Sequence, residues 1–289
     1  MLDFSRLNLA DAPVIKPLLT HSYSRLCDYV FGTLLLWRDM WPTEFAIYND
    51  TVFFRLESEN GRKGYLLPVG GNLGQALDVL DSYHKSHKLF YNVPKTELDF
   101  LQQRYSAVSV SAISSGGDYI YDAAAMAAVK GRKLHGQRNH MNYFDRTWVH
   151  HFEKITDANV QDVRAFVERE VVSDSSDLFR EGTRKTFELL DNRDVYDFSS
   201  LALYVGDEII GFTFGSLLGD TLYVSIEQAD RNFRGAYPKL VSAFVSEHLD
   251  KGAVFVNRED DLGDEGLRKS KLAWNPCDVI ERFYVNVEG

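Results

Sequence analysis

The sequence of 289 residues has few cysteines, no long apolar run and no excess of basic residues. Cys27 and Cys277 are too few for a framework of disulfides, so the fold must depend on packing. The longest apolar stretch, near 29–37, is far shorter than the roughly 20 residues of a membrane-spanning helix. Because the first residues also lack the pattern of a secretory signal, we expect a cytoplasmic protein without an integral membrane segment.

Acidic residues outnumber basic ones by 42 to 32, which gives a formal net charge of −10 and a pI near 5.3. Such a surface repels phosphates over a large area, so it argues against DNA binding and disfavours a general RNA-binding protein. It leaves room for one local basic cleft. The motifs of phosphate-binding loops, serine hydrolases and zinc proteases are missing, and no histidine stands at metal-ligand spacing from carboxylates or cysteines. We therefore predict no metal site.

One stretch, 118–144, reverses the local charge. It contains no Asp or Glu from Ala123 to Phe144, whereas it contains the cations Lys130, Arg132, Lys133 and Arg138. Two interpretations are open. The stretch is a solvated helix whose charges are paired elsewhere in the fold, or it forms an electropositive shelf between two half-proteins, where an anionic group docks.

The elements predicted on either side of this stretch follow one order. After helices over 1–40, hydrophobic periodicity and turn residues predict a hairpin over 45–56, a strand over 65–69, a helix over 73–87, a strand over 88–93, a helix over 96–105 and candidate strands over 107–114 and 118–122. The second half predicts a strand over 148–155, helices after Thr156 and over 183–190 flanking a polar loop at 173–177, a three-stranded meander over 200–230, a helix up to Leu249, a strand over 253–257, a helix over 264–272 and a strand over 279–287.

Each half thus runs strand–strand–strand–helix–strand–helix–strand, and Asn92 and Asn257 occupy the same place after a strand. We interpret this order as a tandem duplication of two α+β domains, 1–145 and 146–289, in which mixed sheets are flanked by helices. The first domain would end in the basic linker helix. Two unrelated α+β domains are the alternative interpretation.

The connection after the last strand of the meander is the first candidate site. The segment RNFRGAYPKL (231–240) leads from this strand into a helix. A helix N-terminus preceded by a flexible Gly235 can offer backbone amides to an anion, and Arg234 would add charge. The alternative is a plain strand-to-helix connection in which Gly235 serves only the turn.

A group of charged residues around the next strand is the second candidate. Glu227 is the acid within an otherwise apolar strand, so it would have a raised pKa suited to proton transfer, or be the buried partner of an arginine. Further polar residues follow the neighbouring strand and lie on the short helix after it: Asn257, Arg258, Glu259, Lys269 and Lys271. The end of a strand in a mixed sheet is a common place for reactive groups, although an ion-paired surface loop has the same composition.

Three ordered segments, 118–144, 231–240 and VNREDDLGDEGLRKSKLAWNP (256–276), resemble the family defined by the C-terminal domain of phosphatidylglycerol lysyltransferase. The early segment 22–41 looks like the N-terminal half of the same family. The resemblance implies two tandem acetyltransferase-like (GNAT) domains, related in fold to Fem-type aminoacyl transferases. In that family the lysyltransferase passes an aminoacyl group from charged tRNA to a lipid headgroup.

The resemblance also permits a comparison with acetyl-CoA enzymes of the GNAT fold, which usually present Arg/Gln-x-x-Gly-x-Gly/Ala at this connection. Aligned on Gly235, this chain has Asn232 in the first position and Tyr237 in the last, which weakens the case for coenzyme A. In the first half the corresponding segment, Gly70-Gly71-Asn72, has no cations. We infer that the N-terminal copy is structural and that the C-terminal copy holds the site.

The sequence therefore predicts an acyl- or aminoacyl-transferase that takes its group from a phosphate-bearing donor, acyl-CoA or aminoacyl-tRNA, and passes it to an amine or hydroxyl. It would need no cofactor, its partner would be a small-molecule or tRNA-borne anionic donor, and its oligomeric state is not predicted. Glu227 or Glu259 would deprotonate the acceptor and Asn257 would polarise the acyl carbonyl. The donor would be bound by Arg138, Asn139, Asn142, Arg234, Gly235, Tyr237, Arg258, Lys269 and Lys271. The alternative is a non-catalytic ligand-binding module on a duplicated GNAT scaffold.

Overall fold

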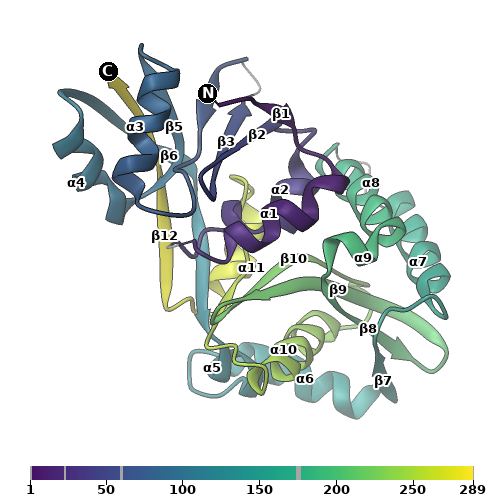
Figure 1. The fold of residues 1–289 in the computed structure, drawn as a ribbon. Helices are drawn as coiled ribbons and strands as arrows, with labels where there is room; N and C mark the ends of the chain where they lie inside the picture. Colours follow the sequence, from purple (N-terminus) through teal and green to yellow (C-terminus); the bar gives the residue numbers. More distant parts are fainter. Residues whose placement is uncertain (1, 23, 59–60, 174–176, 289) are drawn as a thin grey trace. The chain divides into compact units, whose positions relative to one another are not determined.

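The computed structural model describes residues 2–22, 24–58, 61–173 and 177–288, which form two compact units. Unit 1 consists of residues 1–118, 260–264 and 279–289, and unit 2 of residues 119–259 and 265–278. Each unit combines a mixed sheet with helices (Figure 1). The α+β class predicted from the sequence is confirmed.

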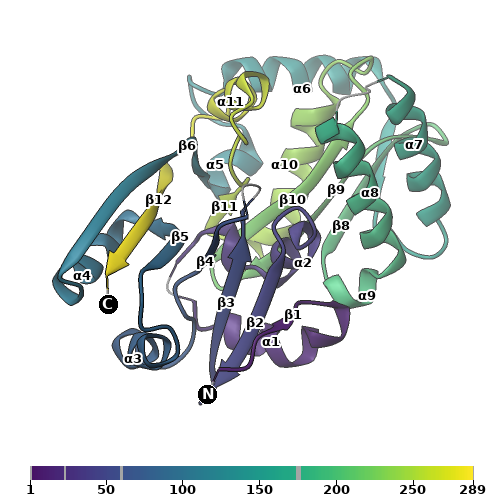
Figure 2. The ribbon, with the colours of Figure 1, turned by 90° about the horizontal axis from the view of Figure 1, so that it is seen from above.

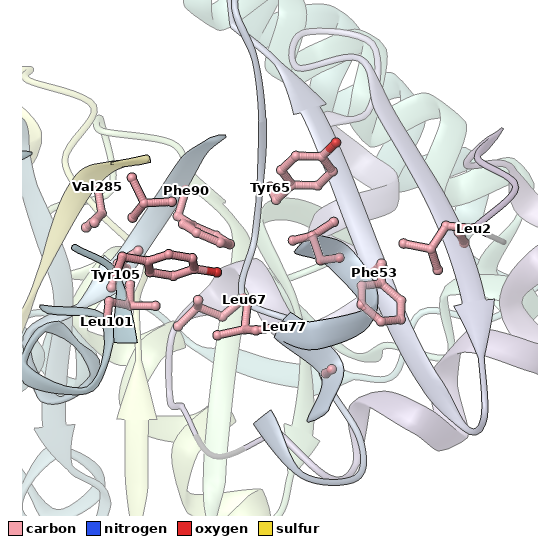
Figure 3. Close-up of a cluster of buried hydrophobic side chains, with 14 residues drawn as sticks. Leu2, Phe53, Tyr65, Leu67, Leu77, Phe90, Leu101, Tyr105 and Val285 are labelled. Carbon is pink, nitrogen blue, oxygen red and sulfur yellow. The ribbon is translucent and has the colours of Figure 1, made fainter. Parts of the chain in front are cut away.

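Unit 1 begins with a short strand and several short helices and continues with further strands and two longer helices. Its elements are β1 (Ser5–Arg6), η1 (Leu9–Asp11), α1 (Ala12–Leu19), η2 (Cys27–Tyr29), α2 (Phe31–Trp37), β2 (Thr43–Tyr48), β3 (Thr51–Glu57), β4 (Lys63–Tyr65), α3 (Leu73–Tyr83), β5 (Lys88–Pro94), α4 (Lys95–Arg104), the first part of β6 (Ala107–Asp122) and most of β12 (Asp278–Glu288). Its core, shown in Figure 3, collects aromatic and aliphatic side chains from the strands and α3, among them Phe53, Leu67, Leu77 and Phe90. Val285 of β12 belongs to the same core.

The predicted hairpin of unit 1 is confirmed. Tyr48 pairs with Thr51, and the two residues between them, Asn49 and Asp50, have φ of 46° and 56°. Positive φ at both positions is the requirement of the two-residue hairpin turn, and Asn and Asp tolerate it better than most residues.

Unit 2 contains the rest of the chain. Its elements are the end of β6, α5 (Ala123–Ala128), α6 (His135–Thr147), β7 (His150–Glu153), α7 (Val160–Ser173), α8 (Asp177–Asp191), α9 (Arg193–Tyr196), β8 (Ser199–Val205), β9 (Glu208–Leu218), β10 (Thr221–Ala229), α10 (Ala236–Leu249), β11 (Phe255–Asn257) and α11 (Glu265–Leu272). The polar loop predicted at 173–177 falls mostly on residues 174–176, which lie outside the described residues.

The meander of unit 2 is covered on both faces. Phe212 of β9 packs edge-on against Phe166 of α7, with ring centroids 5.9 Å apart. Gly215, three residues further along, faces Phe244 of α10 instead. Because successive residues of a strand point to opposite faces, these two contacts place α7 and α10 on opposite sides of the meander, as the second view also shows (Figure 2).

The strands of the two units pair in the same series. In unit 1 the pairs β1–β2, β2–β3 and β3–β4 are antiparallel, β4–β5 is parallel and β5–β12 is antiparallel. In unit 2 the pairs β7–β8, β8–β9 and β9–β10 are antiparallel, β10–β11 is parallel and β11–β6 is antiparallel. The repeated order of elements predicted from the sequence is therefore present. The closing strand of each series, however, comes from the other half of the sequence.

This exchange explains why the compact units differ from the predicted domains 1–145 and 146–289. Residues 119–145 belong to unit 2, because β6 pairs with β11 through Ile120–Asp122 and because α5 and α6 pack against α10. Residues 279–289 belong to unit 1, because β12 pairs with β5.

Three predicted elements differ in extent. The two candidate strands over 107–122 are one strand, β6. The strand predicted over 65–69 ends at Tyr65, and only Val69 continues with an isolated bridge to Val52. The central basic stretch is not one helix, because Val129 adopts φ 46° and ends α5 before α6 begins.

Candidate functional site

The edge of β10 organises the candidate site in unit 2. β10 pairs with β11 over Thr221–Tyr223 only, although it continues to Ala229. Among the described residues, no strand covers the β11 side of β10 from 224 onward. On its other side, the register with β9 shifts between Val224 and Ile226, which marks a β-bulge. Bulges redirect side chains and are frequent next to active sites, and Glu227 lies two residues after Ser225, where the register shifts.

Glu227 forms a buried ion pair with Arg258. The Arg258 Nη2 donates to Glu227 Oε1 at 2.9 Å, and the two side chains are 11% and 10% exposed. Burial raises the pKa of the Glu227 carboxyl, while Arg258 and then Lys271 act in the opposite direction. Glu227 is thus the buried partner of an arginine, and burial raises its pKa, while its use in proton transfer stays a prediction.

The guanidinium of Arg258 has one further hydrogen-bonding atom inside this site. Its Nη1 is buried and makes no hydrogen bond to any described residue. Its Cζ lies 5.9 Å from the centre of the Trp274 ring, and Arg258 lowers the pKa of Tyr121 against the larger, raising effect of burial. A buried N–H without an acceptor is costly, so this atom is suited to an oxygen of a bound group.

The loop after β11 holds Arg258 in place. Asn257 is fully buried, and its Oδ1 accepts from the backbone N–H of Glu259 at 2.6 Å. That bond stabilises Glu259 at φ 57°, an unfavourable backbone conformation for glutamate. The Lys271 ammonium donates to the backbone oxygens of Arg258 and Glu259. Asn257 and Lys271 therefore shape the turn that presents Arg258.

Tyr237 lies beside the same edge of β10, at the start of α10. Burial raises the pKa of its hydroxyl, a hydrogen bond with the backbone of Ala229 lowers it, and the charge of Glu227 raises it. The hydroxyl therefore stays protonated at neutral pH, close to the end of β10 and to Glu227.

Gly235 has a packing role. Its φ is 98°, and a Cβ at this position would overlap the backbone oxygen of His140 and lie 2.9 Å from the Cβ of Phe144. The close approach that requires glycine is therefore made by α6. Pro238 also removes one N–H from the first turn of α10, which leaves fewer amides for an anion. For Gly235, the interpretation as a turn residue describes the structure better than the anion cradle.

The cations near α6 are engaged in local contacts. Arg234 Nε bonds to His140 Nδ1 at 3.2 Å, and its Cζ stacks 4.9 Å from the Tyr143 ring centre. Arg138 Nη1 donates to the backbone oxygens of Val129 and Gly131, at 2.8 and 3.1 Å. Arg138 therefore supports the strained turn between α5 and α6. The geometry of both guanidinium groups is explained without a ligand.

The remaining predicted donor-binding residues lie on exposed helix surfaces. Asn139 bonds to His135 within α6 at 3.0 Å, and Asn142 and Lys269 are exposed. The structure thus brings together Glu227, Tyr237, Arg258 and Lys271 with the backbone of Asn257 and Glu259. It does not join Arg138, Asn139, Asn142 or Lys269 to them through any described contact.

Two aromatic residues of the site were missed by the sequence reasoning. Tyr121 donates its hydroxyl to the backbone oxygen of Lys271 at 2.9 Å, and Trp274 packs against Arg258. Tyr119 and Tyr121 stand two apart in a strand and so share one face, which was readable from the sequence. That this face belongs beside β11 follows only from the strand exchange.

The corresponding loop of unit 1 is filled by its own chain. A Cβ on Gly70 would overlap the backbone oxygen of Asp50, and Thr51 Oγ1 donates to the backbone oxygen of Gly70 at 3.2 Å. The glycines of this copy therefore allow the loop to cross the β2–β3 turn closely. That the N-terminal copy is structural stays a prediction.

Two further features of the described residues bear on function. No group of three or more His, Cys, Asp or Glu side chains in this part of the chain is arranged to hold a metal ion. Within the same residues, no helix has the length and apolar character needed to cross a membrane.

Comparison with known proteins places these observations in a family. The profile described as phosphatidylglycerol lysyltransferase, C-terminal, matches residues 21–286. The chain belongs to this family. An uncharacterized protein of Mycoplasmoides gallisepticum is 26% identical over 205 residues, which cover 66% of this chain and 62% of that protein. The matched region thus spans less than two thirds of this curated relative.

Several solved structures superpose on nearly the whole chain. A protein of unknown function from Bacteroides thetaiotaomicron matches with a TM-score of 0.88 and 28% identity, over 100% of both chains. L-PGS from Bacillus licheniformis matches with a TM-score of 0.65 and 13% identity, over 95% of this chain and 90% of that one. FemX matches with a TM-score of 0.62 and 9% identity, over 98% of this chain and 96% of that one. The predicted tandem GNAT-like fold is confirmed.

Proposed function

We propose that this protein transfers an activated aminoacyl or acyl group to an amine or hydroxyl acceptor, at the edge of β10 in unit 2. The observation that carries the proposal is the buried Glu227–Arg258 pair beside a strand edge that no described strand covers. The family name, phosphatidylglycerol lysyltransferase, supports aminoacyl transfer as the reaction class.

The uncovered edge of β10 suits the acyl part of a donor. Backbone N–H and C=O groups at a strand edge can bond an extended amide in the way that a further strand would. A donor placed there would have its carbonyl near Glu227, two residues after the bulge. Tyr237 would stand at the end of the same edge, with a hydroxyl that keeps its proton and can donate a hydrogen bond to the departing group.

Arg258 and Glu227 would divide the charge changes of the reaction. When the acceptor attacks the carbonyl carbon, the carbonyl oxygen gains negative charge, and the free Nη1 of Arg258 could donate a hydrogen bond to it. The acceptor must lose a proton in the same step, and Glu227 is the nearby carboxylate whose pKa burial has raised. The carbon–oxygen or carbon–sulfur bond to the donor then breaks, and the leaving group takes a proton.

Asn257, Glu259 and Lys271 would act mainly through the turn that holds Arg258. The side-chain oxygen of Asn257 already accepts from Glu259, so we assign it a positioning role rather than contact with the acyl carbonyl. Donor phosphates would meet the cations near α6, Arg234 above all. An aminoacyl-tRNA carries more phosphates than an acyl-CoA and would contact more of these cations.

The proposal is tested by donor binding followed by a transfer assay. Acetyl-CoA, a long-chain acyl-CoA and lysyl-tRNA are compared with free coenzyme A and uncharged tRNA in thermal-shift measurements. A ligand at a hundred times its Kd stabilises by roughly 2.7 kcal/mol, which raises the melting temperature by several degrees. Transfer is then measured for the responding donor with a panel of amines, alcohols and phosphatidylglycerol vesicles.

Variants separate the assigned site from the rest of the molecule. Glu227→Gln and Arg258→Met should abolish transfer, whereas Lys95→Ala, which alters an exposed ion pair with Glu281 in unit 1, should leave it unchanged. Transfer that survives both site variants contradicts the assignment. Binding without transfer to any acceptor would favour the non-catalytic ligand-binding module.

A further inference from the structure

An open pocket on unit 1 is lined entirely by residues of that unit, none of which belongs to the site assigned above. It encloses about 540 Å³, within the usual range for small-molecule sites. Its lining comes from the last turn of α3, the segment that leads into β5, the end of α4 with the two residues after it, and the end of β12. Most of these side chains are charged, so the pocket suits a polar ligand.

The acid inside the pocket, Asp81, is largely saturated with donors from the protein. Its Oδ1 accepts from the Tyr105 hydroxyl at 3.0 Å and lies 3.1 Å from the Lys88 ammonium. Its Oδ2 accepts from Arg104 Nη2 at 2.6 Å. The ring of Tyr105 packs in the core of unit 1, which holds this arrangement in place (Figure 3). Asp81 therefore serves as an internal counter-ion and has little capacity left for a ligand.

Lys88 is likewise used within the protein. Its side chain is 0% exposed, and its ammonium donates to the backbone oxygens of His84 at 3.0 Å and Ser86 at 3.3 Å, in addition to its pairing with Asp81. All three N–H groups of the ammonium are thus occupied. They also neutralise carbonyl oxygens just after the end of α3, which would otherwise oppose a negative ligand.

Three other donors of the pocket have no acceptor within the described part of the chain. The Nε of Arg104 is buried and makes no hydrogen bond there, although Nη2 of the same guanidinium bonds to Asp78 and Asp81. Lys85 and Ser106 are exposed, and their side chains make no hydrogen bond or ion pair with a described residue. Because a buried N–H without an acceptor is unfavourable, the pocket is suited to a group that supplies acceptor oxygens.

The charges of the pocket also favour an anion. Its three cations outnumber its two acids, Asp81 and Glu288, and Glu288 is 60% exposed and lies 3.7 Å from His87 Nδ1. A third acid, Asp78, bonds to Arg104 from outside the lining and is 69% exposed. Solvent screens these two exposed carboxylates more than it screens the guanidinium of Arg104, which is 21% exposed.

We propose that this pocket binds a small oxyanion, a carboxylate or a phosphate, through Arg104, Lys85 and Ser106. One oxygen would accept from Arg104 Nε, and the exposed Lys85 and Ser106 would donate to the remaining oxygens. Arg104 would keep its bond to Asp81, so the ligand completes the network and displaces no part of it. This inference is independent of the proposed function, because every residue it uses belongs to unit 1. It gives the N-terminal copy a ligand-binding role in addition to its predicted structural one.

The Nε–H resonance of Arg104 in a nitrogen-15 NMR spectrum of the full chain reports directly on this bond, and its loss in Arg104→Lys assigns it. We would titrate the chain at pH 6.5 with sodium phosphate and with sodium acetate, and separately with sodium chloride and methylammonium chloride at the same ionic strength. Phosphate, acetate or both should shift the resonance until it saturates, and the one that binds more tightly identifies the source of the oxyanion. Chloride and methylammonium should leave the resonance in place.

Variants separate this pocket from the other cations of the chain. Lys85→Ala should raise the apparent Kd of the responding oxyanion by roughly three- to tenfold, and Ser106→Ala by less. Lys95→Ala, at another exposed lysine of unit 1, should leave the Kd unchanged. Both pocket variants retain the buried network around Asp81, so an unchanged melting temperature shows that weaker binding is not due to unfolding. A resonance that responds to neither oxyanion, an equal response to chloride or methylammonium, or a Kd that neither pocket variant changes would overturn the site.

Discussion

The Glu227–Arg258 pair permits a prediction that connects its burial to stability and pH. Both side chains are about nine-tenths buried, so removing one partner leaves an uncompensated charge in a low-dielectric site. Losses for such single removals are roughly 3–5 kcal/mol, whereas replacing both partners by neutral groups of similar size is often close to neutral. We expect Arg258→Met and Glu227→Gln each to lower the free energy of unfolding at pH 7, and the double variant to recover most of the loss.

The pH dependence gives the sign of the electrostatic effect. Burial is the largest influence on the pKa of Glu227 and raises it, and Arg258 is the largest influence that lowers it. In Arg258→Met the folded-state pKa should therefore rise further above the unfolded value. A group with a raised folded pKa stabilises the protein at low pH, and that contribution is lost as the pH rises through the folded pKa. Arg258→Met should consequently be less destabilising at pH 5 than at pH 8.

Urea unfolding followed by circular dichroism measures these differences. A loss of about 3 kcal/mol should also lower the melting temperature by roughly 10 °C. Arg146→Met, at an exposed position in the last turn of α6, is the control and should stay within about 0.5 kcal/mol of the parent. Equal losses of stability at both pH values would refute the reasoning. So would a loss in the double variant that equals the sum of the two single losses, because the pair would then not be electrostatically coupled.

Two further substitutions test the contacts around α6. Gly235→Ala should lower the free energy of unfolding by about 3 kcal/mol or more, because Gly235 has φ 98° and an added Cβ would overlap His140. As a control, Gly136→Ala meets nothing within 4 Å and should stabilise α6 by about 0.5–1 kcal/mol; equal effects of the two variants in thermal melts would show that Gly235 does not contact α6. Arg138→Ala should lower the free energy of unfolding by about 1–2 kcal/mol, because the backbone oxygens of Val129 and Gly131 lose their donor. Arg138→Lys should not restore this stability, because the two hydrogen bonds need a guanidinium. Full rescue by lysine would mean that only the charge matters.

Much of the fold was predictable because the sequence patterns of turns, helices and strands do not depend on which strands pair with one another. The Asn49-Asp50 turn, the apolar faces of the helices and the alternation of the strands each depend on neighbouring residues. The order of elements followed from them, and with it the duplication. Partner choice of the closing strands was not predictable, because β6 and β12 have similar alternating patterns and either pattern fits either unit.

The candidate site likewise combines features that the local sequence predicts with features that depend on distant residues. Glu227 stood out as an acid in an apolar strand, and it is the buried partner of an arginine, while its use in proton transfer stays a prediction. Gly235 was assigned to an anion from the short pattern around it, but the atom that requires glycine there belongs to His140, 95 positions earlier. Such long-range approaches leave no trace in the local sequence.

The strand exchange predicts that neither half of the sequence folds alone. A fragment 146–289 lacks six large side chains of unit 2 that are at least 95% buried in the whole chain: Tyr119, Ile120, Tyr121, Met126, Leu134 and Phe144. At about 1.5–3 kcal/mol each, their burial amounts to roughly 9–18 kcal/mol, as much as the whole stability of a typical domain. A fragment 1–145 lacks β12, and so Asp28 and Asp118 would lose Arg282.

We expect each fragment, expressed separately, to show no cooperative thermal transition, and the two together to assemble with the circular dichroism spectrum of the intact chain. The intact protein cleaved between 145 and 146 after folding is the control, because it contains every strand partner. A sharp transition in fragment 146–289 alone would contradict the exchange, since it would mean that β11 and α10 need neither β6 nor the helices that follow it. Assembly from separate fragments, in contrast, would show that the two halves are interdependent parts of both units.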